Sequence, residues 1–482
     1  MENLIRKYKR MPVQVRASFW FLICAFLQKG ISMITTPIFT RLLTTTEYGQ
    51  YNVFNSWLNI ITIFVSLSLA GGVYIQGLVK FEKDRDVFAS SIQGLTFTLV
   101  FFWATIYLLF HNFWNQLFNL TTVQMLAMLI MIWTTAVFCL WSNDQRVDFK
   151  YRELVIITIM VSIAKPVLGI ILVVNSDDKV TARILGLVLV ELIGYSWLSI
   201  ISLKKGKTFF SAKYWKYAIC FNLPLIPHYL SQIVLNSSDR IMISNMVGDS
   251  EAGIYSLAYS LSLIMTLFNT ALTQTISPWI YKKIKEKRIK DIASVAYISL
   301  ILIAVVNLCL ILLAPEAVAI FAPEDYYDAI WIIPPVALSV YFMYGYDLFA
   351  KFAFYYEKTN LIMLASVIGA ILNIILNYIF IKLFGYIAAG YTTLACYIIY
   401  SIAHYILMNN ICKKYCDGIR PYETKKIMAV TVPFVIIGFA LLFTYHYPVI
   451  RYGLIAVVAI IAVIKRDALI VLGKKIIDLK KN

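Results

Sequence analysis

The sequence predicts an all-α polytopic membrane protein, and three observations support this fold class. Of the 482 residues, 60% are hydrophobic and 14% are charged, and the mean hydropathy of +0.75 excludes an ordinary soluble domain. Apolar runs of the roughly 20 residues needed to cross a hydrocarbon core follow one another along nearly the whole chain. Alternating segments of about 10 residues, typical of membrane β-barrels, are absent, so each span is expected to be an α-helix that satisfies its own backbone groups.

Taken in chain order, the apolar runs predict fourteen membrane-spanning helices. Each run ends where polar or basic residues begin. The predicted spans are residues 14–41, 50–78, 90–111, 120–141, 153–175, 181–203, 217–246, 251–281, 291–313, 327–350, 359–382, 385–411, 426–445 and 449–465.

The basic residues sort to one side of these spans. With the N-terminus inside, clusters such as KFEKDR (80–85), RVDFKYR (146–152) and KKIKEKRIK (282–290) all fall in inner loops. Six of the 43 Lys and Arg residues fall at the outer ends, namely Arg41, Lys179, Arg183, Arg240, Lys382 and Arg451. This is the positive-inside pattern, and it predicts that both termini are cytoplasmic. The net charge of +17 therefore indicates membrane topology, not nucleic-acid binding.

A weak internal repeat predicts how the spans are grouped. EYGQY at 47–51 is matched by EAGIY at 251–255, an offset of 204 residues that corresponds to six spans. An even number of helices per repeat makes the two halves parallel, so the prediction is two six-helix parallel-repeat lobes around a central cavity. The predicted domains are an N-terminal lobe at 1–215, a C-terminal lobe at 216–425, and two extra C-terminal helices with a cytoplasmic tail at 426–482.

Two lysines lie deep within predicted spans. Lys29 and Lys165 each stand thirteen residues above a basic residue at the inner end of the span, Arg16 and Arg152, which places them about 20 Å higher, near the bilayer midplane. A charge there costs roughly 2.5–3.5 kcal/mol on insertion scales. Each lysine is therefore expected to face a wet cavity or an anion, and the alternative is pairing with a nearby Glu for helix packing.

The remaining candidate residues are charged side chains in or near the spans. Asp239 and Arg240 are adjacent in the outer half of a span, about 100° apart on the helix, so at least one is expected to face the cavity, with an inter-helix bridge as the alternative. Arg41 is a further candidate at the outer interface, where it can equally mark the end of a helix. Glu191 and Asp347 are candidates for H⁺ or Na⁺ coupling, or for pairing with the lysines.

Other kinds of chemistry have little support. The seven cysteines lie mostly inside apolar runs, and the four histidines are scattered over different spans without metal spacing. Gly385 and Gly390 have P-loop spacing, but Tyr391 stands where that motif needs Lys. We therefore expect no catalytic residue, no metal site and no bound cofactor.

Two stretches resemble a known family. PIFTRLLTTTEYGQYNVFNSW (37–57) with SLSLAGGVYIQ (66–76), and LPLIPHYLSQIVLNSSDRIMIS (223–244) with GDSEAGIYSLAYSL (248–261), resemble the polysaccharide-exporter branch of the multidrug/oligosaccharidyl-lipid/polysaccharide (MOP) superfamily, nearest to the Wzx-type flippases of O-antigen and capsule repeat units. The resemblance implies a MATE-like two-lobed fold in the bacterial cytoplasmic membrane. It also implies transport of an undecaprenyl-diphosphate-type lipid-linked oligosaccharide to the outer leaflet, alongside glycosyltransferases and a polymerase.

The charged residues within the predicted spans agree with that expectation. Lys29, Lys165 and Arg240 are the expected contacts for the anionic head group, with Asp239 and Arg41 as further candidates, while the polyprenyl tail stays in lipid. A cation-coupled multidrug antiporter of the same fold is the alternative, although it would favour acids in an N-terminal half that carries two deep lysines. A glycosyltransferase or polymerase of the same pathway would need a sizeable outer loop, and none exceeds about fifteen residues.

Overall fold

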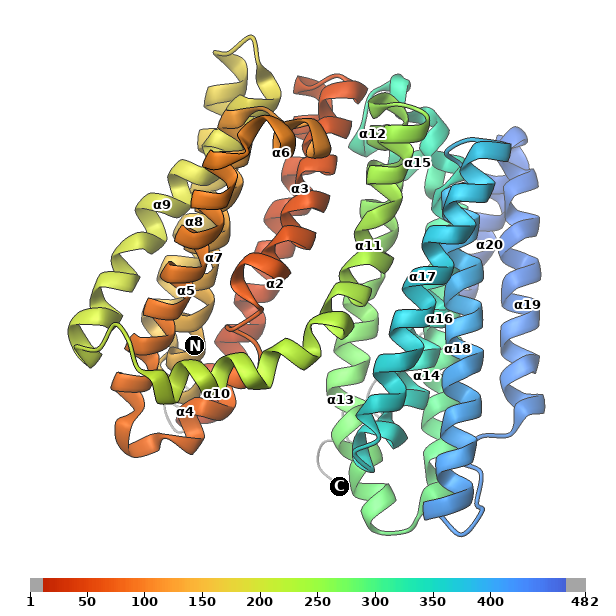
Figure 1. Ribbon diagram of the computed structural model, residues 1–482. Helices are drawn as coiled ribbons and strands as arrows, with labels where there is room; N and C mark the ends of the chain where they lie inside the picture. The colour runs from red at the N-terminus through yellow and green to blue at the C-terminus, as the bar shows by residue number, and fades with distance from the viewer. Residues whose placement is uncertain (1–11, 465–482) are drawn as a thin grey trace, which may run out of the picture. The chain divides into compact units, whose positions relative to one another are not determined.

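The computed structural model describes residues 12–464, and its regular secondary structure over that range is entirely helical (Figure 1). The predicted all-α fold is therefore confirmed. The helices are α2 (Val13–Leu42), α3 (Thr45–Ser66), α4 (Gly72–Lys80), α5 (Arg85–Leu109), α6 (His111–Phe118), α7 (Thr122–Val147), α8 (Tyr151–Val174), α9 (Lys179–Gly206), α10 (Ala212–Asn222), α11 (Ile226–Met246), α12 (Asp249–Leu263), α13 (Thr266–Lys285), α14 (Ile292–Leu312), α15 (Ala314–Phe321), α16 (Ile333–Tyr355), α17 (Thr359–Phe384), α18 (Ala388–Tyr415), α19 (Thr424–Leu442) and α20 (Pro448–Ile464). Short 3₁₀ segments are η1 (Glu82–Asp84), η2 (Leu223–Leu225), η3 (Ile289–Asp291), η4 (Glu324–Trp331) and η5 (Phe443–His446).

Eleven helical stretches within residues 12–464 are long and apolar enough to cross a membrane. A twelfth is formed if η4 and α16, which are bent by 48° at their junction, count as one span. The eleven are Arg16–Leu42, Glu82–Leu109, Thr122–Val147, Tyr151–Val174, Lys179–Gly206, Ala212–Met246, Asp249–Lys285, Ile289–Leu312, Leu361–Phe384, Ala388–Tyr415 and Thr424–His446. The chain is therefore a multi-pass membrane protein.

The predicted total of fourteen spans stays a prediction, and two regions account for the difference. The predicted span 50–78 is not one helix, because α3 ends at Ser66 and α4 begins at Gly72. Between them Leu67 and Ser68 adopt φ angles of 49° and 51°, a conformation that ends an α-helix. In the last predicted span, α20 contributes a shorter apolar stretch, Pro448–Val457. The N-terminal basic cluster before residue 12 and the cytoplasmic tail expected after residue 464 lie outside the described residues.

The chain divides into two compact units, which we describe separately. Unit 1 comprises Met1–Ile233 and unit 2 comprises Val234–Asn482, so the division falls within α11. The domain boundaries expected from the sequence, at residues 215 and 425, stay predictions.

Unit 1 is organised around α9. This helix packs against α5, α7 and α8, and α2 packs along α8 (Figure 1). The turn between α2 and α3 is fixed by a capping box, in which Thr44 Oγ1 accepts from the Glu47 backbone N–H at 3.2 Å and Glu47 Oε2 accepts from the Thr44 N–H at 2.7 Å. Glu47 therefore serves the local architecture at the start of α3.

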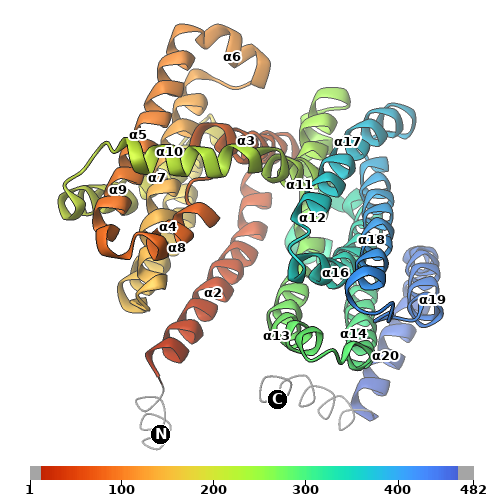
Figure 2. The ribbon, with the colours of Figure 1, turned by 60° about the horizontal axis from the view of Figure 1, so that its bottom comes forward.

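Unit 2 is organised around α16. Most of its side chains are buried, and it packs against α12, α13, α14 and α18 (Figure 2). The core contains aromatic side chains from α16 and from its neighbours, including Tyr341, Phe352 and Tyr422. Helix α17 packs on α18, and α19 packs on α14.

Candidate functional site

Unit 1 contains a polar pocket of about 300 Å³ between four of its helices. It is lined from α2 by Gln28, Ile31, Ser32, Thr35 and Phe39, from α3 by Tyr51, from α8 by Ser162, Lys165, Pro166 and Gly169, and from α9 by Arg183 and Leu187. The α2 residues recur at three- and four-residue intervals, which places them on one face of that helix. Hydroxyl, amide and cationic groups thus share one pocket, and three of the four helices around it, α2, α8 and α9, are long and apolar enough to cross a membrane.

Two glycines bring α8 and α9 close together beside this pocket. A Cβ on Gly186 would lie 2.7 Å from the Gly169 Cα atom, so only glycine permits this approach of the two backbones. A Cβ on Gly169 would lie 3.2 Å from the ring of Phe39. The close approach of α8 and α9 allows a side chain of one helix to reach an acid on the other.

Lys165 makes such a contact. Its Nζ lies 2.6 Å from Glu191 Oε1, and the Glu191 side chain is only 4% exposed. Glu191 Oε2 also accepts hydrogen bonds from the Thr134 and Thr135 hydroxyls, at 2.8 and 3.2 Å. The structure therefore joins two candidates that the sequence treated separately. The charge of Lys165 is compensated by Glu191, although its side chain still lines the pocket.

Arg183 is the second cation of the pocket. Its guanidinium carbon lies 3.4 Å from the centre of the Tyr51 ring and 4.0 Å from that of Phe39. These cation–π contacts orient the group without neutralising its charge. Nη1 of Arg183 is buried and has no hydrogen-bond partner among the described residues. The uncompensated positive charge of the pocket therefore belongs to Arg183.

Sequence reasoning missed Arg183, because it was counted among the basic residues of the outer ends. In the structure it stands four residues into α9, about 6 Å along the helix from Lys179. The available signal was that position 183 falls inside the predicted span 181–203 and not in the loop before it.

Lys29 and Arg41 lie elsewhere on α2. Lys29 is exposed, is not among the residues lining the polar pocket, and takes part in none of the ion pairs found within residues 12–464. It follows Gln28 directly, so it projects about 100° away from the pocket face. Arg41 is exposed, and its Nη1 donates to the Pro37 carbonyl at 2.9 Å.

Asp239 and Arg240 belong to unit 2, where they face different partners. Asp239 is fully buried and accepts hydrogen bonds from the Tyr255 hydroxyl (2.6 Å), the Asn377 amide (2.5 Å) and the Thr393 hydroxyl (3.0 Å). No ion pair within the described part of the chain involves it. Arg240 donates to the Asn236 carbonyl at 2.8 Å, and its guanidinium lies 4.5 Å from the centre of the Tyr259 ring.

Asp347, the remaining acid predicted as a coupling site, is paired with a cation. Its Oδ1 lies 2.7 Å from Lys351 Nζ, one helical turn further along α16, and its Oδ2 accepts from the Thr273 hydroxyl at 2.7 Å. Within residues 12–464, no cluster of three His, Cys, Asp or Glu side chains is arranged to hold a metal ion.

Comparisons with known proteins agree with this architecture. The sequence profile of the polysaccharide biosynthesis protein family matches residues 15–283, and that of the MatE family matches residues 224–379. Among curated proteins, the chain is 23% identical over 384 residues to Lsg locus putative protein 1 of Haemophilus influenzae, covering 73% of this chain and 88% of that protein.

Solved structures show the same fold. Lipid II flippase MurJ, in its inward closed conformation, superposes with a TM-score of 0.71 at 15% identity, covering 93% of this chain and 99% of that one. A multidrug resistance MATE family transporter of the MOP superfamily, in its inward-facing conformation, superposes with a TM-score of 0.60 at 12% identity, covering 80% and 96%. The MATE-like fold expected from the sequence is confirmed. The chain belongs to the polysaccharide biosynthesis protein family, and it shares its fold with the MurJ and MATE structures.

Proposed function

We propose that this protein is a flippase that moves a polyprenyl-diphosphate-linked oligosaccharide from the cytoplasmic to the outer leaflet by alternating access. The transported unit would serve surface polysaccharide synthesis, as a capsule or O-antigen repeat unit, in the bacterial cytoplasmic membrane with both termini in the cytoplasm. Glycosyltransferases and a polymerase would act before and after it. Membership of the polysaccharide biosynthesis protein family supports this proposal.

The main observation that supports this proposal is the polar pocket of unit 1. A cation held between membrane-spanning helices is costly unless an anion or water compensates it. Because Glu191 already neutralises Lys165, the free charge is that of Arg183, whose Nη1 has no partner in the described residues. A diphosphate would form charge-assisted hydrogen bonds with this guanidinium.

The rest of the pocket suits a sugar. Gln28, Ser32, Thr35 and Ser162 supply amide and hydroxyl groups that can exchange hydrogen bonds with sugar hydroxyls. Lys29, Arg41 and Arg240 stay proposed as further contacts for the head group during transport, since each is a cation in or beside a membrane-spanning helix.

For the driving force, we propose coupling to H⁺ or Na⁺, with Asp239 as the residue that accepts the ion. Asp239 was expected to contact the head group, whereas Glu191 and Asp347 were the expected coupling acids. Both of those acids have a lysine partner, and Asp239 has only neutral hydrogen-bond partners. A buried carboxylate that has no lysine in direct contact takes up a proton or a small cation more readily than one that is paired with a lysine.

The test of this function uses a strain that lacks the gene and is complemented with variants. Replacing Arg183 by Gln removes the charge but keeps a polar side chain, and we expect surface polysaccharide to fall roughly tenfold, about the loss of one charge-assisted contact. The lipid-linked intermediate should accumulate in the same cells. Arg152→Gln is the matched control, because Arg152 is an exposed arginine on α8 outside the pocket. Wild-type polysaccharide in the strain that lacks the gene would refute the proposed function.

The second candidate function is a cation-coupled multidrug antiporter. The MatE match over residues 224–379 and the buried Asp239 favour it. This function predicts resistance to cationic dyes on overexpression, and that resistance should disappear with Asp239→Asn. The positive charge of Arg183 in the polar pocket is the observation that places this candidate second, because it would repel a cationic drug.

A further inference from the structure

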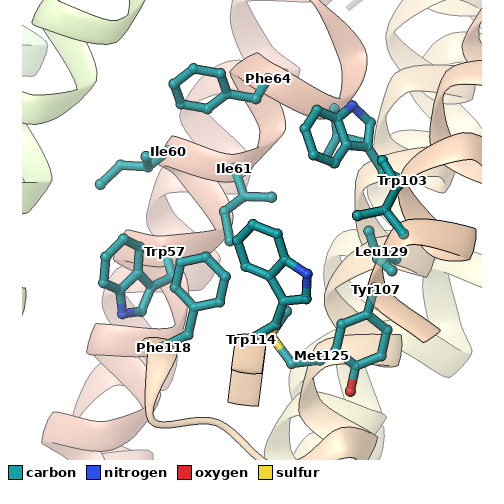
Figure 3. A pocket seen from close by; sticks show the side chains of 12 residues that line it. Trp57, Ile60, Ile61, Phe64, Trp103, Tyr107, Trp114, Phe118, Met125 and Leu129 are labelled. Atoms are coloured by element: carbon teal, nitrogen blue, oxygen red, sulfur yellow. The ribbon is translucent and has the colours of Figure 1, made fainter. Parts of the chain in front are cut away.

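Unit 1 contains a second cavity whose chemistry differs from that of the polar pocket. It has a volume of about 270 Å³ and lies between α3, α5, α6 and α7 (Figure 3). Two of these helices, α5 and α7, are long and apolar enough to cross a membrane. Figure 3 shows Trp57 and Phe64 of α3 on one side and Trp103 of α5 on the other, with Trp114 of α6 between them.

The walls of this cavity exclude an anion or a sugar. None of its lining residues is charged. The Tyr107 hydroxyl donates to Asn115 Oδ1 at 3.0 Å, so it is already engaged. The indole nitrogen of Trp114 is buried and has no partner among the described residues, which leaves one free donor in a wall that is otherwise apolar. A sugar needs many donors and acceptors when it leaves water, and this cavity cannot supply them.

The cavity also reaches an apolar outer surface. Phe64 lines it and is 41% exposed. On the helices that contribute other walls of the cavity, Leu109 at the end of α5 and Phe113 of α6 are 70% and 59% exposed. In a membrane protein such a surface faces lipid chains, so a hydrocarbon chain can enter the cavity from the bilayer without crossing a polar region.

Helix α3 separates the apolar cavity from the polar pocket. Tyr51 lines the polar pocket, and Ile60 lines the apolar cavity. These residues are nine positions apart, so they lie on opposite faces of an α-helix with about 3.6 residues per turn. One helix thus presents a polar site on one face and an apolar site on the other, and a lipid-linked sugar combines the same two chemistries.

We propose that the apolar cavity holds part of the polyprenyl chain of the transported lipid while the polar pocket holds its head group. The inference rests on the proposed function for the identity of the chain. The aromatic side chains of the cavity wall would contact the chain, and no charged group lines the cavity to disfavour it. Helix α3 sets the distance between the chain and the head group.

The experiment uses the full chain in nanodiscs of phosphatidylcholine. The probe is undecaprenyl phosphate with a diazirine in its isoprenoid chain, and crosslinked peptides are mapped by mass spectrometry. We expect crosslinks in residues 57–65 and 103–118, and competition by unlabelled undecaprenyl phosphate.

Two variants and one control test the assignment to this cavity. Ile61→Trp fills the cavity from α3, and we expect the crosslink yield to fall roughly tenfold because the chain loses the apolar surface it would bury there. Leu129→Phe narrows the cavity from α7 with a smaller change in volume and should reduce the yield less. Phe102→Trp is the matched control, since Phe102 is exposed on α5 and does not line the cavity.

Each other outcome overturns the inference in a distinct way. Crosslinks that compete with undecaprenyl phosphate but map outside the cavity would leave the proposed function standing and remove the cavity from it. Equal competition by phosphatidylglycerol would assign the cavity to bilayer phospholipid. The absence of any crosslink that undecaprenyl phosphate displaces would count against the proposed function as well.

Discussion

Corresponding sets of residues in the two units carry opposite charges, at different positions within the set. Helices α2 and α11 end 204 residues apart, at Leu42 and Met246, and helices α3 and α12 begin 204 residues apart, at Thr45 and Asp249. Helices α8 and α17 begin 208 residues apart, and α9 and α18 begin 209 residues apart. By these offsets, unit 1 has Thr35, Tyr51, Gly169 and Arg183 where unit 2 has Asp239, Tyr255, Asn377 and Thr392. Each set therefore has one charged member, a cation on α9 in unit 1 (Arg183) and an acid on α11 in unit 2 (Asp239), and each charge stands where the other unit has a threonine.

The two sets of residues also differ in how deeply they are buried. In unit 1 these residues line an open pocket, and Arg183 keeps an unpaired guanidinium nitrogen among the described residues. In unit 2, Asp239 and Asn377 are fully buried, and the Thr392 hydroxyl donates to Asn377 Oδ1. The open, cationic pocket of unit 1 suits a large anionic head group, whereas the buried acid of unit 2 suits a small cation. The role of each charge therefore depends on the partners that its unit supplies.

The largest effect is expected at Asp239, the buried acid of unit 2. Asp239→Ala leaves the Tyr255, Asn377 and Thr393 donors without their acceptor, so we expect a loss of about 3 kcal/mol in the free energy of unfolding. Thermal unfolding of the purified protein in detergent measures this loss. Asp239→Asn is the control that keeps most of the hydrogen bonds while removing the charge. An Asp239→Ala protein as stable as the wild type would show that the network does not hold unit 2 together.

A smaller effect is expected at the Lys165–Glu191 pair of unit 1. Lys165→Met leaves the nearly buried Glu191 without a cation, and because Lys165 itself is 27% exposed we expect a loss of about 2 kcal/mol. Adding Glu191→Gln should restore most of that stability. Lys205→Met breaks a pair with Asp86 whose side chains are 61% and 49% exposed, and should cost under about 0.5 kcal/mol. Failure of the double variant to recover would mean that the two residues do not act as a pair.

The smallest effect is expected at Lys29. Lys29→Ala should lower surface polysaccharide by roughly threefold, since an exposed cation outside the polar pocket contributes a weak contact in comparison with Arg183. Surface polysaccharide and membrane insertion are measured in the same complemented strain, with Lys29→Arg as the control that keeps the charge. Normal surface polysaccharide in the Lys29→Ala strain would remove this residue from the mechanism. A larger loss of polysaccharide than that caused by Arg183→Gln would show that Lys29 contributes more than Arg183.

Local features of the sequence were sufficient for much of the fold. Hydropathy located the membrane helices, because apolar runs of about 20 residues are a local property. The repeat of EYGQY and EAGIY marked the starts of α3 and α12, where Thr44 and Glu47 cap α3. The single offset of 204 did not hold along the chain, because η4 adds a 3₁₀ segment before α16 and shifts the later helices of unit 2.

The partners of the charged residues required the tertiary structure. Lys165 and Glu191 were both named as candidates, but they stand 26 residues apart on different helices, and the close approach at Gly169 and Gly186 that joins them has no local signature. Depth arguments singled out Lys29, yet the pocket face of α2 is rotated away from it. The depth of a residue along a helix follows from its position in the sequence. The direction of its side chain relative to a pocket depends on which neighbouring helix packs against each face.

Hydropathy and charge thus suffice for the all-α membrane class, and two short stretches of sequence carry the family resemblance, because all of these are properties of residues close together in the chain. The position of the polar pocket does not follow from them. Arg183 meets Phe39 and Tyr51 only because α2, α3 and α9 converge in unit 1, and Asp239 loses contact with solvent only because α12, α17 and α18 close over it in unit 2. Which charge stays free is a property of long-range packing, and packing is decided by the folded chain as a whole.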